Sequence, residues 1–392
     1  MNIVFLGLMY TEQSLLDAKK YSKCGLQMAP HNFQTTLING FKQLKDVNVS
    51  VLNIPIVGSF PVNYKFPVIK KEHWDMNNVQ IGYLNIPIIK RIQQKRKLIH
   101  QLREIISEYG QEDLFFMAYN TYEPFLKVLQ KLKKQYPNIK NGLIVTDCVP
   151  GRGDMDKYMS RRAKKLGDQV VRYSQDIDFF VLLTKHIAAA LEISDKPYVI
   201  MECICNEKQE CCNVKMSSNN ICLYTGSIEA EFGICEIVDA FSMIDNAELW
   251  ICGEGSGKDY VEKMAKKYHN IKFYGFMSPA QLQELRNESD YLINPRRPTG
   301  SYTKYSFPSK TAEYMMSGKP VIMYKLEGIP DEYDKFLNYL SAETSEEIKK
   351  ELEKIFSQEY NLLTDKALKG RAFMLCNKNS KVQAENILNN WR

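Results

Sequence analysis

A regular alternation of short apolar runs with amphipathic helical segments constrains the fold more than any other feature of this sequence. The alternation is densest between residues 221 and 324. There the pattern predicts strands at Ile221–Thr225, Glu248–Cys252, Ile271–Tyr274, Tyr291–Asn294 and Pro320–Tyr324. It predicts helices between them at Glu236–Met243, Lys258–Tyr268, Pro279–Arg286 and Lys310–Ser317. Such alternation favours a parallel sheet covered by helices, as in a Rossmann-like domain.

The first half of the chain has a looser version of the same pattern. Its predicted strands are Ile3–Met9, Val49–Ile54, Asp113–Ala118, Gly142–Thr146 and Phe179–Thr184, and its clearest helices are Asn32–Leu44 and Glu123–Tyr136. A chain of 392 residues is too long for one ordinary core. We therefore predict an α/β protein with two Rossmann-like domains, at residues 1–205 and 220–375. A polar linker is expected at 206–219, and a C-terminal helix at 376–392 is expected to pack back on the first domain.

The N-terminus and the cysteines indicate a cytoplasmic protein. The sequence MNIVFLGLMYTEQ has no basic region, and its apolar run is much shorter than the ~20 residues that span a membrane. The ten cysteines are scattered, as expected for reduced thiols. A cluster at Cys203, Cys205, Cys211 and Cys212 lacks the spacing of a zinc ribbon or finger, so we interpret it as thiols in a polar linker.

Glycines follow several of the predicted strands of the second half. Gly226 and Ser227 follow the first strand, Gly253 follows the second, and Gly275 with Phe276 follows the third. Ligands of open α/β sheets bind at the carboxyl ends of the strands, where glycine lets backbone N–H groups come close. Each glycine alone fits an ordinary turn, but the series favours a ligand site. The sequence Gly-Glu-Gly at 253–255 lacks the third glycine of a dinucleotide fingerprint.

The segment YSFPSKTAEYMMSGKPVI, residues 305–322, carries the sharpest candidate site. Pro308 can open a helix, Ser309 can cap it, and Lys310 adds a cation beside the positive end of the helix dipole. This combination suits a diphosphate. Glu313 lies one turn further, where a carboxylate can accept both vicinal hydroxyls of a ribose. Without its context, the segment also fits a plain helix cap followed by an acidic residue.

This segment closely resembles the donor-binding motif of retaining GT-B glycosyltransferases of family four, which build bacterial polysaccharides. The family motif is E-x7-E followed by a G-x-P-V turn, and Glu313 with GKPV at 318–321 matches its second half. The segments TGS, ICGEGSG, FYGFMSP and DYLINP follow in family order and spacing. The FPSK form resembles enzymes of capsule and exopolysaccharide biosynthesis. The resemblance implies two Rossmann-like domains facing across a cleft.

The resemblance also implies a reaction. A sugar would move from a UDP- or GDP-sugar donor to a glycan acceptor, which is expected to be lipid-linked. The anomeric configuration would be retained, because the acceptor attacks the face that the nucleotide leaves and the leaving phosphate takes the acceptor proton. No cofactor or metal is expected, since the nucleotide-sugar is a substrate. The backbone near Phe276 would contact the base.

The sequence departs from the family pattern at two places. Tyr305 stands where the first glutamate of E-x7-E is expected, so the sugar-hydroxyl contact is missing or supplied differently. The first loop of the donor domain, GSIEAEFG, lacks the Arg and Lys that neutralise the diphosphate in relatives. We infer that Lys310 replaces them, because a metal-free site must compensate the leaving diphosphate.

Two residues of the first half are weaker candidates. Gly25 resembles the first glycine loop of the family, which faces the donor phosphates and the acceptor. Asp147, after GLIVT, falls near the position where relatives often place a histidine that contacts the donor sugar. As a carboxylate it would bind a sugar hydroxyl or the acceptor, although an aspartate at a strand end is equally common as a cap.

Basic residues are concentrated in the first half. Residues 1–206 hold 28 basic and 19 acidic residues, a net charge of +9, whereas the whole chain has +6. The segment 86–106 predicts an amphipathic helix with an apolar stripe at Ile88, Ile92, Ile99, Leu102 and Ile106. Its cations include Lys90, Arg91, Lys95, Arg96 and Lys97. A core-facing helix with a solvated charged face is the common interpretation. We favour docking on an anionic membrane at the inner face of the cell.

Three alternative functions remain open at this stage. A metal-dependent GT-A transferase would use a D-x-D string, present at Asp154–Asp156 and Asp176–Asp178, although neither string follows a strand directly. A sugar-nucleotide-binding protein without catalysis is suggested by the missing first glutamate. Nucleic-acid binding through the basic half is disfavoured, because no basic motif with interleaved aromatic residues is present.

Overall fold

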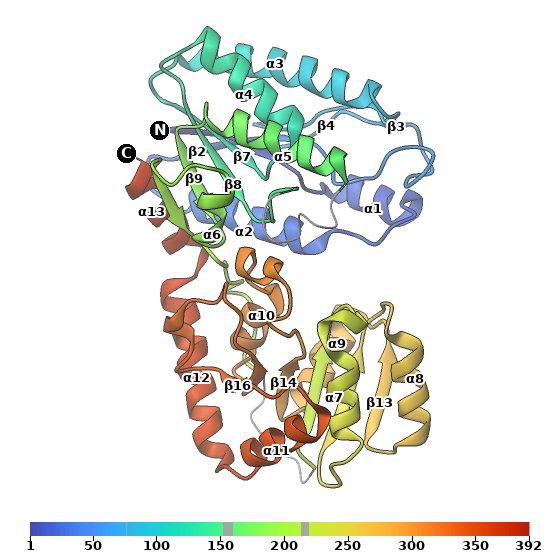
Figure 1. Cartoon of the computed structure of the whole chain (residues 1–392). Helices are drawn as coiled ribbons and strands as arrows, with labels where there is room; N and C mark the ends of the chain where they lie inside the picture. Colours follow the sequence, from blue (N-terminus) through green and yellow to red (C-terminus); the bar gives the residue numbers. More distant parts are fainter. Residues whose placement is uncertain (76, 152–159, 213–218, 392) are drawn as a thin grey trace. The chain divides into compact units, whose positions relative to one another are not determined.

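A computed structural model describes residues 1–75, 77–151, 160–212 and 219–391. The chain forms two compact units, each a mixed α/β layer structure (Figure 1). Unit 1 contains Met1–Ile204 together with the C-terminal segment from Ser380, and unit 2 contains Cys205–Asn379. The predicted α/β class with parallel sheets is confirmed.

Unit 1 is built on an eight-stranded sheet in the order β10-β9-β8-β7-β1-β2-β5-β4. All neighbouring strands are parallel except β4 and β5. The strands are β1 (Asn2–Gly7), β2 (Asn48–Asn53), β4 (Glu72–Asp75), β5 (Asn78–Gln80), β7 (Leu114–Tyr119), β8 (Lys140–Val145), β9 (Phe179–Leu182) and β10 (Tyr198–Ile200). A separate antiparallel pair joins β3 (Val68–Ile69) to β6 (Tyr83–Leu84).

Helices cover both faces of this sheet (Figure 1). They are α1 (Glu12–Tyr21), α2 (Met28–Lys42), α3 (Ile89–Tyr109), α4 (Glu123–Gln135), α5 (Arg161–Ser174), α6 (His186–Ala190) and α13 (Ser380–Trp391). On one face, α2 and α13 bury a core that includes Phe5, Phe41, Ile387 and Trp391. The described residues contain no helix that is long and apolar enough to cross a membrane.

Unit 2 has a fully parallel six-stranded sheet in the order β13-β12-β11-β14-β15-β16. Its strands are β11 (Ile221–Thr225), β12 (Glu248–Cys252), β13 (Ile271–Gly275), β14 (Tyr291–Asn294), β15 (Val321–Tyr324) and β16 (Asn338–Leu340). Its α-helices are α7 (Ile234–Phe241), α8 (Lys258–Lys267), α9 (Pro279–Glu288), α10 (Ser309–Ser317), α11 (Ser345–Phe356) and α12 (Tyr360–Asn377). The strand order reverses between β11 and β14, and ligands of open α/β sheets bind at such a switch point.

The expected linker at 206–219 does not stand apart from unit 2 over its described part. Gln209 donates a hydrogen bond to the Glu313 carbonyl at 2.8 Å, and the Cys212 N–H donates to the Ser317 carbonyl at 2.8 Å. In the cysteine cluster at this boundary, Cys203, Cys205 and Cys212 are buried rather than solvated, whereas Cys211 is exposed. This segment therefore packs against α10 instead of bridging freely.

Candidate functional site

The candidate donor site lies at the switch point of unit 2, where the loops after β11 and β14 leave neighbouring strands. The loop after β14 passes through a 3-10 turn at Ser301–Tyr305 and then enters α10. Pro308 occupies the cap position of α10 with an extended backbone, and no side chain caps the helix. Ser309 is instead the first residue of the helix, so the prediction that it caps the helix is wrong. The start of α10 therefore has no side-chain cap from Pro308, and the Thr311 N–H donates to the Pro308 carbonyl at 2.9 Å.

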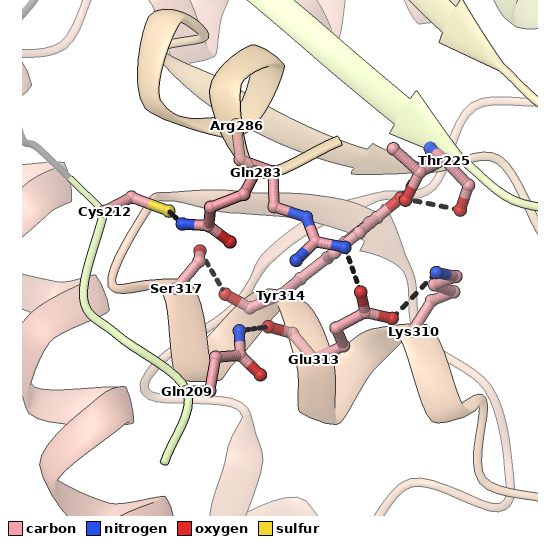
Figure 2. A network of polar contacts seen from close by, with 9 residues as sticks. All are labelled: Gln209, Cys212, Thr225, Gln283, Arg286, Lys310, Glu313, Tyr314 and Ser317. Carbon is pink, nitrogen blue, oxygen red and sulfur yellow. Dashed lines mark hydrogen bonds and ion pairs between the residues drawn. The ribbon is translucent and has the colours of Figure 1, made fainter. Parts of the chain in front are cut away.

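Glu313 is the centre of a polar network on α10 (Figure 2). Its Oε2 atom accepts a hydrogen bond from Lys310 Nζ at 2.7 Å. Its Oε1 atom accepts a hydrogen bond from the guanidinium of Arg286, which reaches it from α9. The Glu313 side chain keeps 31% of its surface exposed, whereas Arg286 is buried. The carboxylate is therefore fixed by two cations while part of it still faces solvent.

The charge balance around Glu313 keeps this carboxyl group ionised. Burial favours its neutral form, but the nearby charges of Lys310 and Arg286 and their hydrogen bonds outweigh burial and hold its pKa below the ordinary value. Two cations against one carboxylate leave one net positive charge at the start of α10. An anionic ligand is therefore favoured there.

Lys319, in the SGKPV turn after α10, holds the end of α9 that carries Arg286. Its side chain is fully buried, and Nζ donates to the carbonyls of Asn287 and Ser289. A lysine ammonium is well suited to the free carbonyls at a helix C-terminus. The motif thus has a structural role that the sequence interpretation did not assign: it fixes α9, and with it Arg286, relative to α10.

Tyr314 ties α10 to the first glycine loop. Its buried hydroxyl accepts a hydrogen bond from the Thr225 N–H at 2.8 Å and lies 3.2 Å from the Thr225 carbonyl, to which it donates. Thr225 is the last residue of β11, directly before Gly226 and Ser227. Tyr314, the residue after Glu313, therefore fixes the position of α10 relative to the end of β11. Sequence reasoning missed this contact, because nothing in the local pattern pairs Tyr314 with a strand far away in the chain.

The glycines after β11 and β12 pack the two loops against each other. A Cβ atom on Gly253 would lie 1.8 Å from the Gly226 carbonyl oxygen, and one on Gly255 would lie 2.4 Å from the Ile228 carbonyl oxygen. The Ile228 N–H donates to the Glu254 carbonyl at 2.9 Å. These glycines are thus required for loop packing, whatever ligand the loops bind.

The remaining predicted donor residues lie at the same edge with different exposure. Phe276, directly after β13, is 82% exposed, so its ring is accessible for stacking on a ligand. Tyr305 is buried beside the start of α10, so its side chain offers little accessible surface for contact with a donor sugar. Their roles stay predictions.

The two candidates in unit 1 both lie in loops. Asp147 lies two residues beyond β8, is exposed, and accepts a hydrogen bond from the side-chain amide of Asn120, which follows β7. Gly25 is exposed in the loop between α1 and α2. The Asp147 carboxylate is therefore oriented at the carboxyl edge of the unit 1 sheet. Its contact with a sugar or acceptor, and the role of Gly25, stay predictions.

The D-x-D strings differ in what the structure describes. Asp154–Asp156 lies outside the described residues. Asp178 accepts from Lys133 Nζ at 2.9 Å and from the Asn141 N–H at 3.0 Å, and Asp176 accepts from Gln130. These contacts tie the turn before β9 to α4 and β8. Within the described residues, no group of three or more His, Cys, Asp or Glu side chains could hold a metal ion.

The basic helix α3 departs from the predicted amphipathic pattern. Its buried residues are Gln94, Leu98, Leu102 and Ile106. Ile88 precedes the helix with a positive φ and is 75% exposed, and Ile89 and Ile92 are also exposed. The exposed Ile88 and Ile92 do not fit the interpretation of α3 as a wholly core-facing helix, whereas the buried Leu102 and Ile106 do. Lys95 forms an ion pair with Glu123 at 3.4 Å, and Lys97 donates to the Gly82 carbonyl at 2.6 Å, whereas Arg91 and Arg96 are exposed.

Comparison with known proteins identifies the kind of domain that carries this site. Residues 208–372 match the family model described as Glycosyl transferases group 1. No curated protein sequence matches the chain.

Solved structures extend the similarity to both units. The chain is similar to sucrose-phosphate synthase from Thermosynechococcus elongatus, with 15% sequence identity and a TM-score of 0.67 over 100% of this chain and 98% of that chain. It is similar to the lipopolysaccharide outer core galactosyltransferase WaaB in its apo form, with 12% identity and a TM-score of 0.62 over 100% and 99% of the two chains. It is also similar to Anabaena HepE in complex with UDP, with 14% identity and a TM-score of 0.60 over 99% of each chain.

The fold is that of GT-B glycosyltransferases with two Rossmann-like domains. Together with the domain match, it supports an enzyme that transfers sugars.

Proposed function

We propose that this chain transfers a sugar from a UDP- or GDP-sugar to a glycan acceptor, with retention of the anomeric configuration, as enzymes of family four do in surface polysaccharide biosynthesis. The observation that carries the proposal is the Glu313 carboxylate held by Lys310 and Arg286 at the switch point of a domain that matches glycosyl transferases group 1. A solved structure of similar fold is a complex with UDP, which supports a nucleotide-diphosphate donor.

In this proposal, the start of α10 binds the ribose and the diphosphate of the donor. Glu313 accepts the ribose hydroxyls through the part of its carboxylate that faces solvent. Lys310 moves from Glu313 to the diphosphate, while Arg286 keeps Glu313 ionised. The backbone N–H groups of Ser309 and Lys310 would add donors for phosphate oxygens.

The reaction needs charge compensation more than proton transfer by the protein. The bond between the anomeric carbon and the diphosphate oxygen breaks, the acceptor oxygen bonds to the same face, and the leaving phosphate takes the acceptor proton. The cation at Lys310 stabilises the negative charge that develops on the diphosphate. The protein otherwise holds donor and acceptor in reactive geometry.

A thermal-shift screen against UDP, GDP, CMP and TDP, with and without EDTA, tests this assignment. A ligand that binds the native state raises its melting temperature. One nucleoside diphosphate is expected to stabilise the wild type in EDTA, and Glu313→Ala and Lys310→Ala are expected to lose that shift. Lys369→Ala is the matched control, because Lys369 forms an ion pair with Asp365 on α12, away from the sheet edge. If the Glu313 and Lys310 variants respond like the control, the donor site lies elsewhere.

The main competing function is a sugar-nucleotide-binding protein without turnover. It is favoured by Tyr305, which stands buried where relatives carry a glutamate. Release of UDP or GDP from the matching nucleotide-sugar in the presence of a glycan acceptor separates the two. Binding without any release would support the competing function.

We further propose that unit 1 docks on an anionic membrane at the cytoplasmic face, close to a lipid-linked acceptor. Exposed apolar side chains at the start of α3 lie among the cations Lys90, Arg91 and Arg96. Val68 and Leu84, which pair across β3 and β6, are also exposed, and β6 packs against α3. Apolar residues rimmed by cations suit the interface of an anionic bilayer.

Co-sedimentation with vesicles tests the membrane proposal. The protein is expected to bind vesicles that contain phosphatidylglycerol and to ignore phosphatidylcholine vesicles at low salt. The double variant Ile88→Ser/Ile92→Ser is expected to weaken binding without loss of folding, because both side chains are exposed. Equal binding to both kinds of vesicle, or none, would contradict it.

A further inference from the structure

Arg296 differs from the other arginines of unit 2 in the partners of its side chain. Arg286 donates to Glu313, and Arg371 donates to the carbonyls of Met316 and Gln209. Arg297 donates to Glu236 Oε1 at 2.8 Å and to the Glu343 carbonyl. The guanidinium of Arg296 has no hydrogen bond or ion pair to any described residue, and its Nε atom is buried. Among the described residues, its charge is therefore not paired with a carboxylate.

Arg296 nevertheless has a defined position. It lies two residues beyond β14, and its backbone N–H donates to Asn294 Oδ1 at 3.2 Å. Its guanidinium carbon lies 5.1 Å from the ring centroid of Phe232 and 5.0 Å from that of Tyr302. Two aromatic rings thus hold the cation, and cation–π contacts stabilise its charge without using its N–H donors.

The rings that hold Arg296 come from two loops of the candidate site. Phe232 belongs to the loop GSIEAEFG after β11, and Tyr302 to the turn that leads into α10. The side chain is also close enough to Tyr224, the penultimate residue of β11, for its charge to oppose the rise that burial causes in the pKa of that phenol. Arg296 therefore lies beside the loop that has no cation of its own.

We propose that Arg296 binds the diphosphate of the nucleotide-sugar donor. The proposal rests on the proposed function, which places the donor at this switch point. The loop after β11 has no cation to bind the diphosphate, and Arg296 supplies one from the loop after β14. Lys310, by contrast, is paired with Glu313 in the structure. A guanidinium presents several N–H donors in a plane, so it can hold two phosphate oxygens at once.

Isothermal titration of the wild type and Arg296→Gln with UDP, UMP and uridine tests the proposal. Loss of a charged, two-pronged contact is expected to weaken UDP binding roughly 10- to 100-fold and to leave uridine binding unchanged. Arg296→Lys keeps the charge but not the planar fork, so an intermediate UDP affinity is expected. This variant also separates binding from folding, because it preserves a cation between the rings.

Arg297→Gln is the matched control. It is expected to lower the melting temperature, since Arg297 links Glu236 to the Glu343 carbonyl, and to leave the ratio of UDP to uridine affinity as in the wild type. An unchanged ratio in Arg296→Gln, with normal UDP binding that Glu313→Ala still abolishes, would overturn the role of Arg296 alone. If the wild type binds neither UDP nor GDP, the proposed function and this inference fail together.

Discussion

The contact between Glu313 and its two cations shows how one residue can serve both stability and binding. An ionised carboxylate that is partly buried must be compensated, and Lys310 with Arg286 provides more charge than the fold alone requires. The two ion pairs leave one net positive charge, which an anionic ligand would neutralise. Because Lys310 and Glu313 are also partly exposed, the pair can rearrange without disturbing the core.

The depressed pKa of Glu313 predicts a pH-dependent contribution to stability. A carboxyl group whose pKa is lower in the folded than in the unfolded state stabilises the fold above its unfolded pKa. This contribution is lost as the pH falls from the ordinary value of 4.5 through the lower folded pKa. Glu313→Gln is therefore expected to destabilise the protein by about 1–2 kcal/mol at neutral pH, since Arg286 loses its counter-ion.

Urea unfolding of the wild type and Glu313→Gln between pH 3 and pH 8 measures this effect. The two curves are expected to converge at the acid end of the range. Glu347→Gln is the comparison: the pKa of Glu347 is also lowered, but this residue is exposed in the capping box of α11, so a smaller pH-dependent loss of stability is expected. A difference between wild type and Glu313→Gln that stays constant with pH would show that the carboxyl group is not linked to folding in this way.

At the scale of elements, the hydrophobic period predicted most of the unit 2 sheet. The predicted strands Ile221–Thr225, Glu248–Cys252 and Tyr291–Asn294 agree with β11, β12 and β14 residue for residue. Buried parallel strands are short apolar runs that end at glycine or proline, so their bounds are visible locally. The edge strand β16 and the pair β3–β6 have no such run and were not predicted.

The sequence was less informative about which elements meet. Glu313 and Lys310 were predicted as donor-site residues because both lie near the start of one predicted helix, although their ion pair was not predicted. Arg286 was not, because its contact depends on how α9 packs beside α10, and no local pattern encodes that packing. The details of α3 were also predicted less well: Ile88 takes a positive φ and the helix begins at Ile89, and Leu98 rather than Ile99 is buried beside Leu102 and Ile106.

The packing between the loops after β11 and β12 gives a prediction at this scale. Gly253→Ala is expected to destabilise the protein by about 3 kcal/mol or more, because the Cβ would overlap the Gly226 carbonyl oxygen and the backbone has a φ of 145°. Gly275→Ala is the control: its φ is also positive, at 68°, but beyond its chain neighbours no atom of the described residues lies within 4 Å of an added Cβ, so only about 1–2 kcal/mol is expected.

Chemical denaturation of both variants measures the difference, and titration with UDP reports on the loop geometry. Gly253→Ala is expected to bind UDP more weakly than Gly275→Ala, since the displaced loop carries Gly226 and Ser227. Equal stability of the two variants would mean that the loops adapt to the added methyl group and that their packing is not fixed.

At the scale of the whole molecule, unit 1 is built from both ends of the chain, and unit 2 is built from the continuous segment between them. The last helix, α13, belongs to unit 1 although it follows α12 of unit 2 directly. Gly40 on α2 lets α13 approach closely, because a Cβ there would lie 2.0 Å from the Ser380 carbonyl oxygen. The Trp391 ring stacks on the Phe179 ring, with 5.5 Å between the ring centroids, and contacts the Phe115 ring edge-on, with 5.1 Å between the centroids. The core of unit 1 thus depends on the most distant part of the sequence.

This dependence predicts where the effect of Trp391→Ala is localised. Removing a buried indole is expected to cost about 3–5 kcal/mol. Hydrogen exchange is expected to accelerate in α13 and in β7, β8 and β9, which lie against the indole. It is expected to stay unchanged in β11, β12 and β14 of unit 2, because local opening follows the packing of each region. Asn389→Ala, at an exposed position of the same helix, is expected to leave exchange as in the wild type. Faster exchange throughout unit 2 would mean that α13 supports both units, and the division of the chain into two cores would then be wrong.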